Sequence, residues 1–134
     1  MAYQIKNGKL KFSNILNKKV TYHDPCYLGR HCGIYNPPRE IIKAIPEIEF
    51  IEMDRNFNNS FCCGGGGGRF FMEEFEAQEK ISEIRIKEAA KIEAQILVTV
   101  CPFCLSMLED SVKTAGLEDK IEVKDISELI VDLI

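Results

Sequence analysis

Six cysteines are the residues of this 134-residue chain with the clearest capacity for chemistry. Two of them are adjacent and are followed directly by five glycines and Arg69, and another two form a Cys-x-x-Cys motif. Thiolates bind soft metal ions and metal clusters, and they act as nucleophiles in redox reactions. The six positions are Cys26, Cys32, Cys62, Cys63, Cys101 and Cys104.

An even number of cysteines is also typical of a disulfide framework in a small secreted protein. The sequence favours metal or redox chemistry instead, because its first residues, MAYQIKNGKLKF, are charged and show no secretory signal. A chain of this length also builds a core that needs no covalent cross-links. The adjacent cysteines would bond to each other only with strain, because their side chains diverge.

The glycine run indicates a binding role beside the cysteine pair. Glycines let backbone N–H groups approach an anionic group closely, so Gly64, Gly65 and Gly66 are predicted to contribute to cofactor binding. Arg69 and Arg30 would add positive charge. A phosphate-binding P-loop is excluded because no Lys-Ser/Thr pair follows the glycines. A flexible linker is the alternative, but the run lies between a cysteine pair and a strong helical pattern.

Composition limits the class of protein and its partners. Hydrophobic residues make up 46% and charged residues 28%, as in a soluble globular domain. The net charge of -4 gives no basic patch, so no nucleic-acid partner is expected. No apolar run approaches the roughly 18 residues of a membrane span. The expected location is the cytoplasm, with membrane contact only through a partner. Residues 1–18 are expected to be a lead-in or linker, and 19–134 a single domain from a larger chain.

Strand and helix patterns alternate from residue 19 onward, which predicts an α/β fold. The expected strands are 20–23, 49–53, 96–100 and 121–125. The expected helices are 38–45, 70–94, 102–115 and a short last helix capped by Ser127. Such alternation predicts an open, four-stranded parallel sheet with helices on both faces. Acidic residues at the start of the long helix suit its positive end, and they are Glu73, Glu74, Glu76 and Glu79.

The cysteine-bearing loops follow three successive strands of this predicted sheet. Cys26 follows the first strand, the 62–63 pair the second, and Cys101 with Cys104 the third. A strand order 2-1-3-4 would make these loops neighbours at the carboxyl edge of the sheet. Five converging thiolates exceed the four ligands that zinc takes, which favours an iron–sulfur cluster. Zinc stays possible if one thiolate does not ligate.

The cysteine spacing and its flanks resemble one known family. Cys26 is followed after 35 residues by Cys62-Cys63-Gly64, and after 36 more by Cys101-Pro-Phe-Cys104. The flanking stretches HDPCYLGRH, CCGGGGGRFFMEE and CPFCLSMLED agree with the same pattern. Over residues 19–134 the chain therefore resembles the cysteine-rich CCG domain found in the B-type and D-type chains of heterodisulfide reductase and in related iron–sulfur oxidoreductases.

The resemblance implies a cofactor and a kind of reaction. It implies a [4Fe-4S] cluster, noncubane in heterodisulfide reductase, held by Cys26, Cys62, Cys63, Cys101 and Cys104. It also implies electron transfer or reductive cleavage of a disulfide substrate, with other iron–sulfur, flavin or haem domains or subunits as partners. Such chains usually hold two CCG domains and this one holds one, so the isolated domain is not expected to be active by itself.

Two other functions stay open from the residues alone. One is a structural zinc module, and the other is a thiol–disulfide oxidoreductase acting through the Cys-x-x-Cys motif. The second is disfavoured because the motif follows the third strand. Cys32 is expected to be a structural thiol, with a ligand or resolving role as the alternative. His23 is expected to hydrogen-bond to backbone or to Asp24, with tuning of the site or proton delivery as the alternative. Several aromatic residues are expected in the core or around the site, and they are Tyr22, Tyr27, Phe70 and Phe71.

Overall fold

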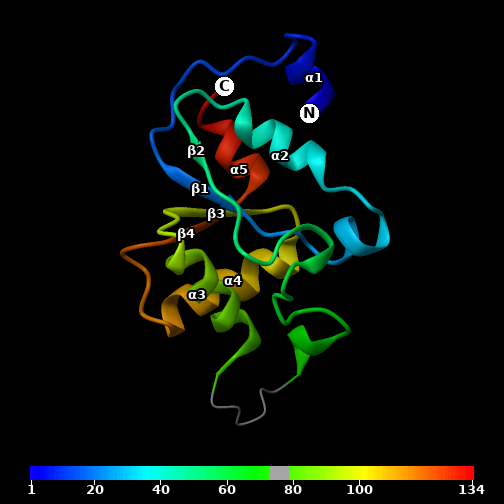
Figure 1. The fold of residues 1–134 in the computed structure, drawn as a ribbon, viewed down its shortest axis with the longest axis vertical. Coiled ribbons are helices and arrows are strands. Elements are labelled where there is room, and N and C mark those ends of the chain that lie inside the picture. Colours follow the sequence, from blue (N-terminus) through cyan, green and yellow to red (C-terminus); the bar gives the residue numbers. More distant parts are fainter. Residues whose placement is uncertain (73–78) are drawn as a thin grey trace.

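Four parallel strands form the centre of the molecule, which we describe from a computed structural model that covers residues 1–72 and 79–134 (Figure 1). The sheet order is β2-β1-β3-β4, which confirms the predicted fold class and strand order. The strand bounds are Lys19–Tyr22 for β1, Glu49–Phe50 for β2, Ile96–Thr99 for β3 and Glu122–Asp125 for β4. All three pairings are parallel, and Val20 lies opposite both Phe50 and Ile96.

Helices cover both faces of this sheet, with α2 and α5 on one side and α3 and α4 on the other (Figure 1). The α-helix bounds are Ala2–Lys6 for α1, Asn36–Lys43 for α2, Ile81–Lys91 for α3, Pro102–Thr114 for α4 and Ile126–Val131 for α5. Three short turns of helix lie in loops: the π-helical η1, Tyr27–His31, and the 3-10 turns η2, Phe57–Asn59, and η3, Arg69–Phe71. Each cysteine-bearing loop therefore leaves the same edge of the sheet.

Alternation along the strands divides the core into two clusters. Val20 and Ile96 face α2 and α5, whereas Leu97 and Val123 face α3 and α4. All four residues of β3 are buried, as expected of a central strand covered on both faces. Cys63 and Cys104 belong to the cluster on the α3/α4 side.

The long helix predicted over 70–94 is wrong in its first part. Gly68 has a left-handed φ of +79°, the following 3-10 turn ends at Phe71, and Met72 is extended. Lys80 is extended as well, so α3 begins only at Ile81. The expected acidic residues Glu73, Glu74 and Glu76 lie outside the described residues, and Glu79 precedes α3. Within residues 1–72 and 79–134, the element near Phe70 is therefore a short 3-10 turn and not the start of the predicted α-helix.

Smaller corrections concern element ends. The second strand ends at Phe50 rather than at residue 53, although Ile51 N–H still donates to Val20 O. The cap of α5 is Asp125 and not Ser127. Asp125 Oδ1 accepts from the Ser127 N–H at 2.9 Å, and Glu128 accepts from the Asp125 N–H at 2.8 Å. This reciprocal pair is a capping box, which satisfies two helix-start donors together.

Residues 1–18 pack on the α2/α5 side of the core. Apolar side chains of this segment contact that cluster, including Ile5, Leu10 and Phe12. The backbone N–H groups of Ser13 and Asn14 both donate to Leu133 O, so this segment is tied to the end of the described chain. Among the helices within 1–72 and 79–134, none has the length and apolar character needed to cross a membrane.

Candidate metal centre

Cysteines from all three predicted loops meet at the carboxyl edge of the sheet. Cys26 lies at the start of η1 after β1, the 62–63 pair lies in the loop after β2, and Cys104 lies in the first turn of α4. Four of the five predicted cysteines line one cavity, which is partly open to solvent. They are Cys26, Cys62, Cys63 and Cys104.

The fifth predicted cysteine, Cys101, is placed differently. It is the N-cap residue of α4 and is half-buried against the core cluster on the α3/α4 side. It is not among the residues that line the cavity. Cys32, outside the predicted set, is exposed one residue after η1 and also does not line the cavity. All six cysteines are free thiols.

Three of the sulfur atoms interact directly with one another. Hydrogen bonding to Cys63 and burial raise the pKa of the Cys62 thiol well above its ordinary value. Hydrogen bonding to Cys104, together with burial, raises the pKa of Cys63 to about 11. These thiols are therefore neutral at pH 7, and a metal that binds them as thiolates must displace their protons.

Two backbone N–H groups of the glycine run donate to the sulfurs of the cysteine pair. The Gly64 N–H donates to Cys62 Sγ at 3.2 Å, and the Gly65 N–H donates to Cys63 Sγ at 3.5 Å. Such donors stabilise negative charge on sulfur. Gly66 and Arg69 are exposed and are not among the cavity-lining residues.

We predict that Gly64→Ala lowers the free energy of unfolding by about 1–2 kcal/mol, the cost of a left-handed conformation for a residue with a Cβ. Gly64 has a φ of +85°, and an added Cβ would lie 3.3 Å from Ile81 Cβ. Urea unfolding of the metal-free protein measures the change. Gly66→Ala is the matched control, because its Cβ would meet no atom within 4 Å. Equal losses in both variants would contradict the prediction.

Arg30 supplies positive charge to the cavity and ties two cysteine loops together. Its side chain lines the cavity, and its Nε donates to Asn58 O at 3.3 Å. A second donor of the guanidinium binds Ser60 O. The loop after β1 is thereby fixed to the loop after β2, which brings Cys26 to the cysteine pair.

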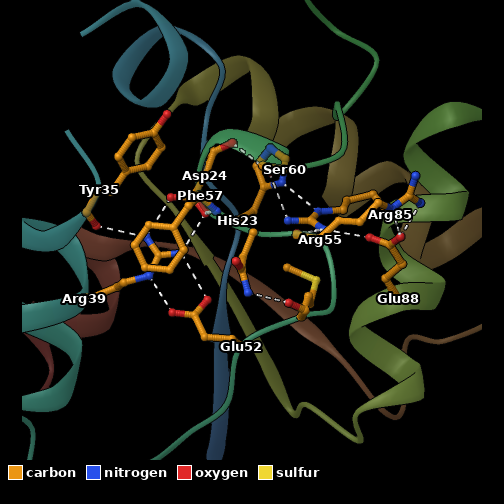
Figure 2. A network of polar contacts seen from close by, with 12 residues as sticks. His23, Asp24, Tyr35, Arg39, Glu52, Arg55, Phe57, Ser60, Arg85 and Glu88 are labelled. Carbon is orange, nitrogen blue, oxygen red and sulfur yellow. Dashed lines mark hydrogen bonds and ion pairs between the residues drawn. The ribbon is translucent and has the colours of Figure 1, made fainter. Parts of the chain in front are cut away.

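Two buried arginines, Arg39 and Arg85, hydrogen-bond to Asp24 and His23, which precede Cys26 in the loop after β1 (Figure 2). Arg39 on α2 donates to both carboxylate oxygens of Asp24 at 2.7 Å, and also binds Glu52 at 2.5 and 3.0 Å. Asp24 Oδ2 additionally accepts from the Phe57 N–H at 2.8 Å. Because the side chains of Arg39 and Asp24 are 3% and 2% exposed, this ion pair is held inside the protein.

Arg85 on α3 forms the second such centre. Its Nε donates to His23 Nδ1 at 3.0 Å, and its Nη2 donates to Ser60 Oγ at 3.2 Å (Figure 2). Its Nη1 binds Arg55 O at 2.9 Å and Glu88 at 2.6 Å. The expectation that His23 bonds to Asp24 is wrong, because the imidazole faces Arg85 instead.

His23 also lies beside the sulfur atoms. One of its ring nitrogens and the sulfurs of Cys63 and Cys104 all lie within 4.8 Å of one another, and all three residues are buried. Burial, and then the positive charges of Arg85 and Arg30, lower the pKa of His23 to about 3. The imidazole is therefore neutral at pH 7.

We predict that the metal-free protein loses stability as the pH falls below about 6.5, by up to about 1.4 kcal/mol per pH unit from His23 alone. The unfolded chain takes up a proton on this residue near pH 6.5, whereas the folded chain does so only near pH 3. The loss therefore continues down to the lower pKa. Denaturant unfolding between pH 7 and 5 should show a smaller slope for His23→Gln. His31→Gln, which changes an exposed histidine, should keep the wild-type slope, and identical slopes in all three proteins would contradict the prediction.

An exposed aromatic cluster lies next to the Cys-x-x-Cys motif. Phe103 stands between the two cysteines, and its ring centroid is 5.2 Å from that of Phe70 and 6.3 Å from that of Phe71. Phe71 is 80% exposed and Tyr27 is 73% exposed, so neither residue lies in the core. Tyr22 is fully buried, as expected.

Sequence reasoning missed Arg39 and Arg85 as residues of the site. A signal for Arg85 existed, because it shares the buried face of α3 with Ser82, Ile86 and Ala89 at spacings of three and four. An arginine on an apolar helix face needs a buried partner. The sequence alone did not show which partner, because His23 is 62 positions away.

The donor set fits a thiophilic metal centre. The sulfur atoms of Cys62, Cys63 and Cys104 contact one another, and backbone N–H groups already point at two of them. Cys26 is exposed on the same cavity, which leaves it accessible to an entering metal. Soft thiolate ligands of this kind select zinc, copper(I) or iron–sulfur clusters over hard cations.

The fold and the site together define a cysteine-rich α/β domain with its thiols at the carboxyl edge of a parallel sheet. The family model CCG, described as a cysteine-rich domain, matches residues 20–109. The chain belongs to this family, which confirms the resemblance seen in the cysteine spacing.

Similar curated proteins are redox proteins by name. The probable iron-sulfur-binding oxidoreductase FadF of Bacillus subtilis is 40% identical over 97% of this chain, which covers 18% of that protein. The D chain of dihydromethanophenazine:CoB–CoM heterodisulfide reductase of Methanosarcina barkeri is 40% identical over 98% of this chain and 32% of that protein. EtfAB:quinone oxidoreductase of Syntrophomonas wolfei is 39% identical over 97% of this chain and 19% of that protein.

The chain thus spans only 18% to 32% of the length of these relatives. No solved structure matches it.

Proposed function

We propose that this chain is an iron–sulfur cluster-binding domain of a larger oxidoreductase. The observation that carries the proposal is the single cavity lined by Cys26, Cys62, Cys63 and Cys104 from three separate loops. Cys101, one turn before Cys104 on the same helix start, is the proposed fifth ligand. The cofactor that we propose for this set is a [4Fe-4S] cluster.

The residues of the chain supply more than ligands. A bound iron–sulfur cluster provides one-electron redox chemistry, whose potential depends on charge, hydrogen bonds to sulfur and exposure to solvent. The N–H groups of Gly64 and Gly65 donate to cysteine sulfur, and Arg30 brings positive charge to the cavity. Cys63 and Cys104 are buried, which limits the access of water to that side of the site.

The proposed role is electron transfer within an assembly, with reductive cleavage of a disulfide as the proposed terminal reaction. The names of the relatives support both parts, since they include one chain of a heterodisulfide reductase and an EtfAB:quinone oxidoreductase. The proposed partners are further iron–sulfur, flavin or haem domains or subunits. The proposed location is the cytoplasm or its membrane face, reached through such a partner.

Anaerobic reconstitution with ferrous iron, sulfide and an equal concentration of zinc tests the proposal. The expected result is a brown protein that binds iron and acid-labile sulfide in the ratio of a [4Fe-4S] cluster. Electron paramagnetic resonance of the oxidised and reduced protein identifies the cluster type. A colourless protein that takes up zinc alone under these conditions would contradict the proposal.

A structural zinc module is the second candidate, and one observation favours it. His23, Cys63 and Cys104 form a buried group whose ligand atoms lie within 4.8 Å of one another. Histidine and cysteine in such a group are the common ligands of structural zinc. The same competition experiment separates the two functions, because zinc bound without iron or sulfide would support the second.

A further inference from the structure

His23 lies between the buried Arg85 and the cysteine sulfurs. This position determines which of its two ring nitrogens carries a proton. Its Nδ1 receives the Nε–H of Arg85 at 3.0 Å. An arginine side chain has five N–H donors and no acceptor, so Nδ1 must be the acceptor in this bond. A neutral imidazole with an accepting Nδ1 carries its single proton on Nε2.

His23 also lines the cysteine cavity. The residue is 1% exposed and lines the cavity together with Cys63 and Cys104. With Nδ1 committed to Arg85, the Nε2–H is the only polar group that the ring can offer to these sulfurs. One ring nitrogen of His23 and the sulfurs of Cys63 and Cys104 lie within 4.8 Å of one another, which places the ring beside the sulfurs.

We propose that Arg85 is a positioning residue that fixes His23 as the Nε2–H tautomer, so that His23 donates a hydrogen bond to cysteine sulfur and does not ligate metal. A metal bond at Nε2 requires a free lone pair there, which this tautomer lacks. The buried His23–Cys63–Cys104 group is thus a set of two sulfur ligands and one N–H donor. Its effect on a cluster potential rests on the proposed function, but the tautomer does not.

The other contacts of Arg85 hold its side chain in the position from which it donates to His23 Nδ1. Its side chain is fully buried, and its donors are also taken by Glu88, Arg55 O and Ser60 Oγ. Glu88 balances the charge of the guanidinium, so Arg85 needs no negative partner among the cysteines. Rotation of Arg85 away from His23 would break these buried bonds, which is costly inside a protein.

The expected consequence is a higher reduction potential of a cluster bound at this site. A hydrogen bond to sulfur stabilises negative charge, and reduction adds negative charge to a cluster. The Nε2–H of His23 would act together with the N–H groups of Gly64 and Gly65. Arg85 contributes through His23, since its own donors are occupied by other partners.

Long-range proton–nitrogen NMR of the ¹⁵N-labelled, metal-free protein at pH 7 tests the tautomer without any cluster. The expected spectrum shows His23 with a protonated Nε2 and an unprotonated Nδ1. Arg85→Met should lose this single pattern, and Arg85→Lys, which can still donate, should retain part of it. Lys91→Gln is the matched control on α3, because Lys91 forms an exposed ion pair with Asp54. A wild-type spectrum with protonated Nδ1, or with both nitrogens protonated, overturns the proposal even if Arg85→Met does not fold.

Redox titration of the reconstituted protein tests the donor role. His23→Leu should lower the equilibrium constant for one-electron reduction about tenfold, which is about 59 mV. His23→Gln, whose amide can donate to the sulfurs, should stay closer to wild type, and His31→Gln should not differ from it. An unchanged potential in His23→Leu, or loss of bound iron specific to His23→Leu and His23→Gln, overturns the donor role.

The two measurements separate this inference from the proposed function. If the protein binds no cluster, the proposed function fails, and the NMR spectrum still decides the tautomer. If the cluster forms but the tautomer is wrong, only the inference fails.

Discussion

Arg39→Met is expected to lower the free energy of unfolding by about 3–5 kcal/mol, the loss seen when one partner of a buried ion pair is removed. Asp24 would keep its charge inside the protein while losing two hydrogen bonds of 2.7 Å. Methionine retains much of the length and apolar character of the side chain. Urea unfolding of the metal-free protein gives the change from the transition midpoint and slope.

Two further variants show whether the charge or the geometry matters. Arg39→Lys keeps the charge but not the flat fork that binds Asp24 and Glu52 together, so an intermediate loss is expected. Lys43→Gln removes an exposed positive charge from the same helix and should leave stability nearly unchanged. A loss below about 1 kcal/mol in Arg39→Met, typical of an exposed pair, would show that the ion pair is not buried in solution.

Cys104→Ser is expected to lower the affinity for iron by at least about tenfold, since even residues behind the ligands change metal affinity by 10–100-fold. Serine nearly preserves the size of the side chain, but its hydroxyl stays protonated at neutral pH. Iron and sulfide content after anaerobic reconstitution, with circular dichroism as a check of folding, measures the effect. Cys32→Ser is the matched control, because Cys32 is exposed and outside the cavity.

Cys101→Ser gives the most informative comparison within this series. If all five predicted cysteines are ligands, it should lose iron as Cys104→Ser does. Retention of the full cluster in Cys101→Ser would limit the ligand set to the four cavity-lining cysteines. Retention in Cys104→Ser would contradict the metal centre itself.

The parallel sheet could be predicted because its signals are local. Buried residues at alternate positions, such as Val20 and Tyr22, mark a strand within a few residues. The strand order 2-1-3-4 was a hypothesis that would make the three cysteine-bearing loops neighbours, and the observed sheet confirms it. The same reasoning placed four of the predicted cysteines in one cavity.

Two kinds of feature could not be predicted from the sequence: local backbone conformation, and ion pairs between residues far apart in the chain. The apolar spacing of the helix predicted over 70–94 continues to its end, but nothing in it reveals that Met72 and Lys80 are extended. Cys101 is the N-cap of α4 and Cys104 lies one turn further, so their side chains point differently although the motif is regular. Arg39 forms its ion pair with Asp24, which lies 15 positions earlier in the chain, and no helical or strand periodicity predicts such a pair.

Both ends of the described chain leave the molecule on the same side. The segment that begins the chain is bonded to Leu133 and packs against the α2/α5 cluster, whereas Cys63 and Cys104 belong to the opposite cluster (Figure 1). A longer polypeptide can therefore enter and leave this unit through adjacent points without crossing the metal centre. Chain attached at these two points would lie away from the cluster that contains Cys63 and Cys104.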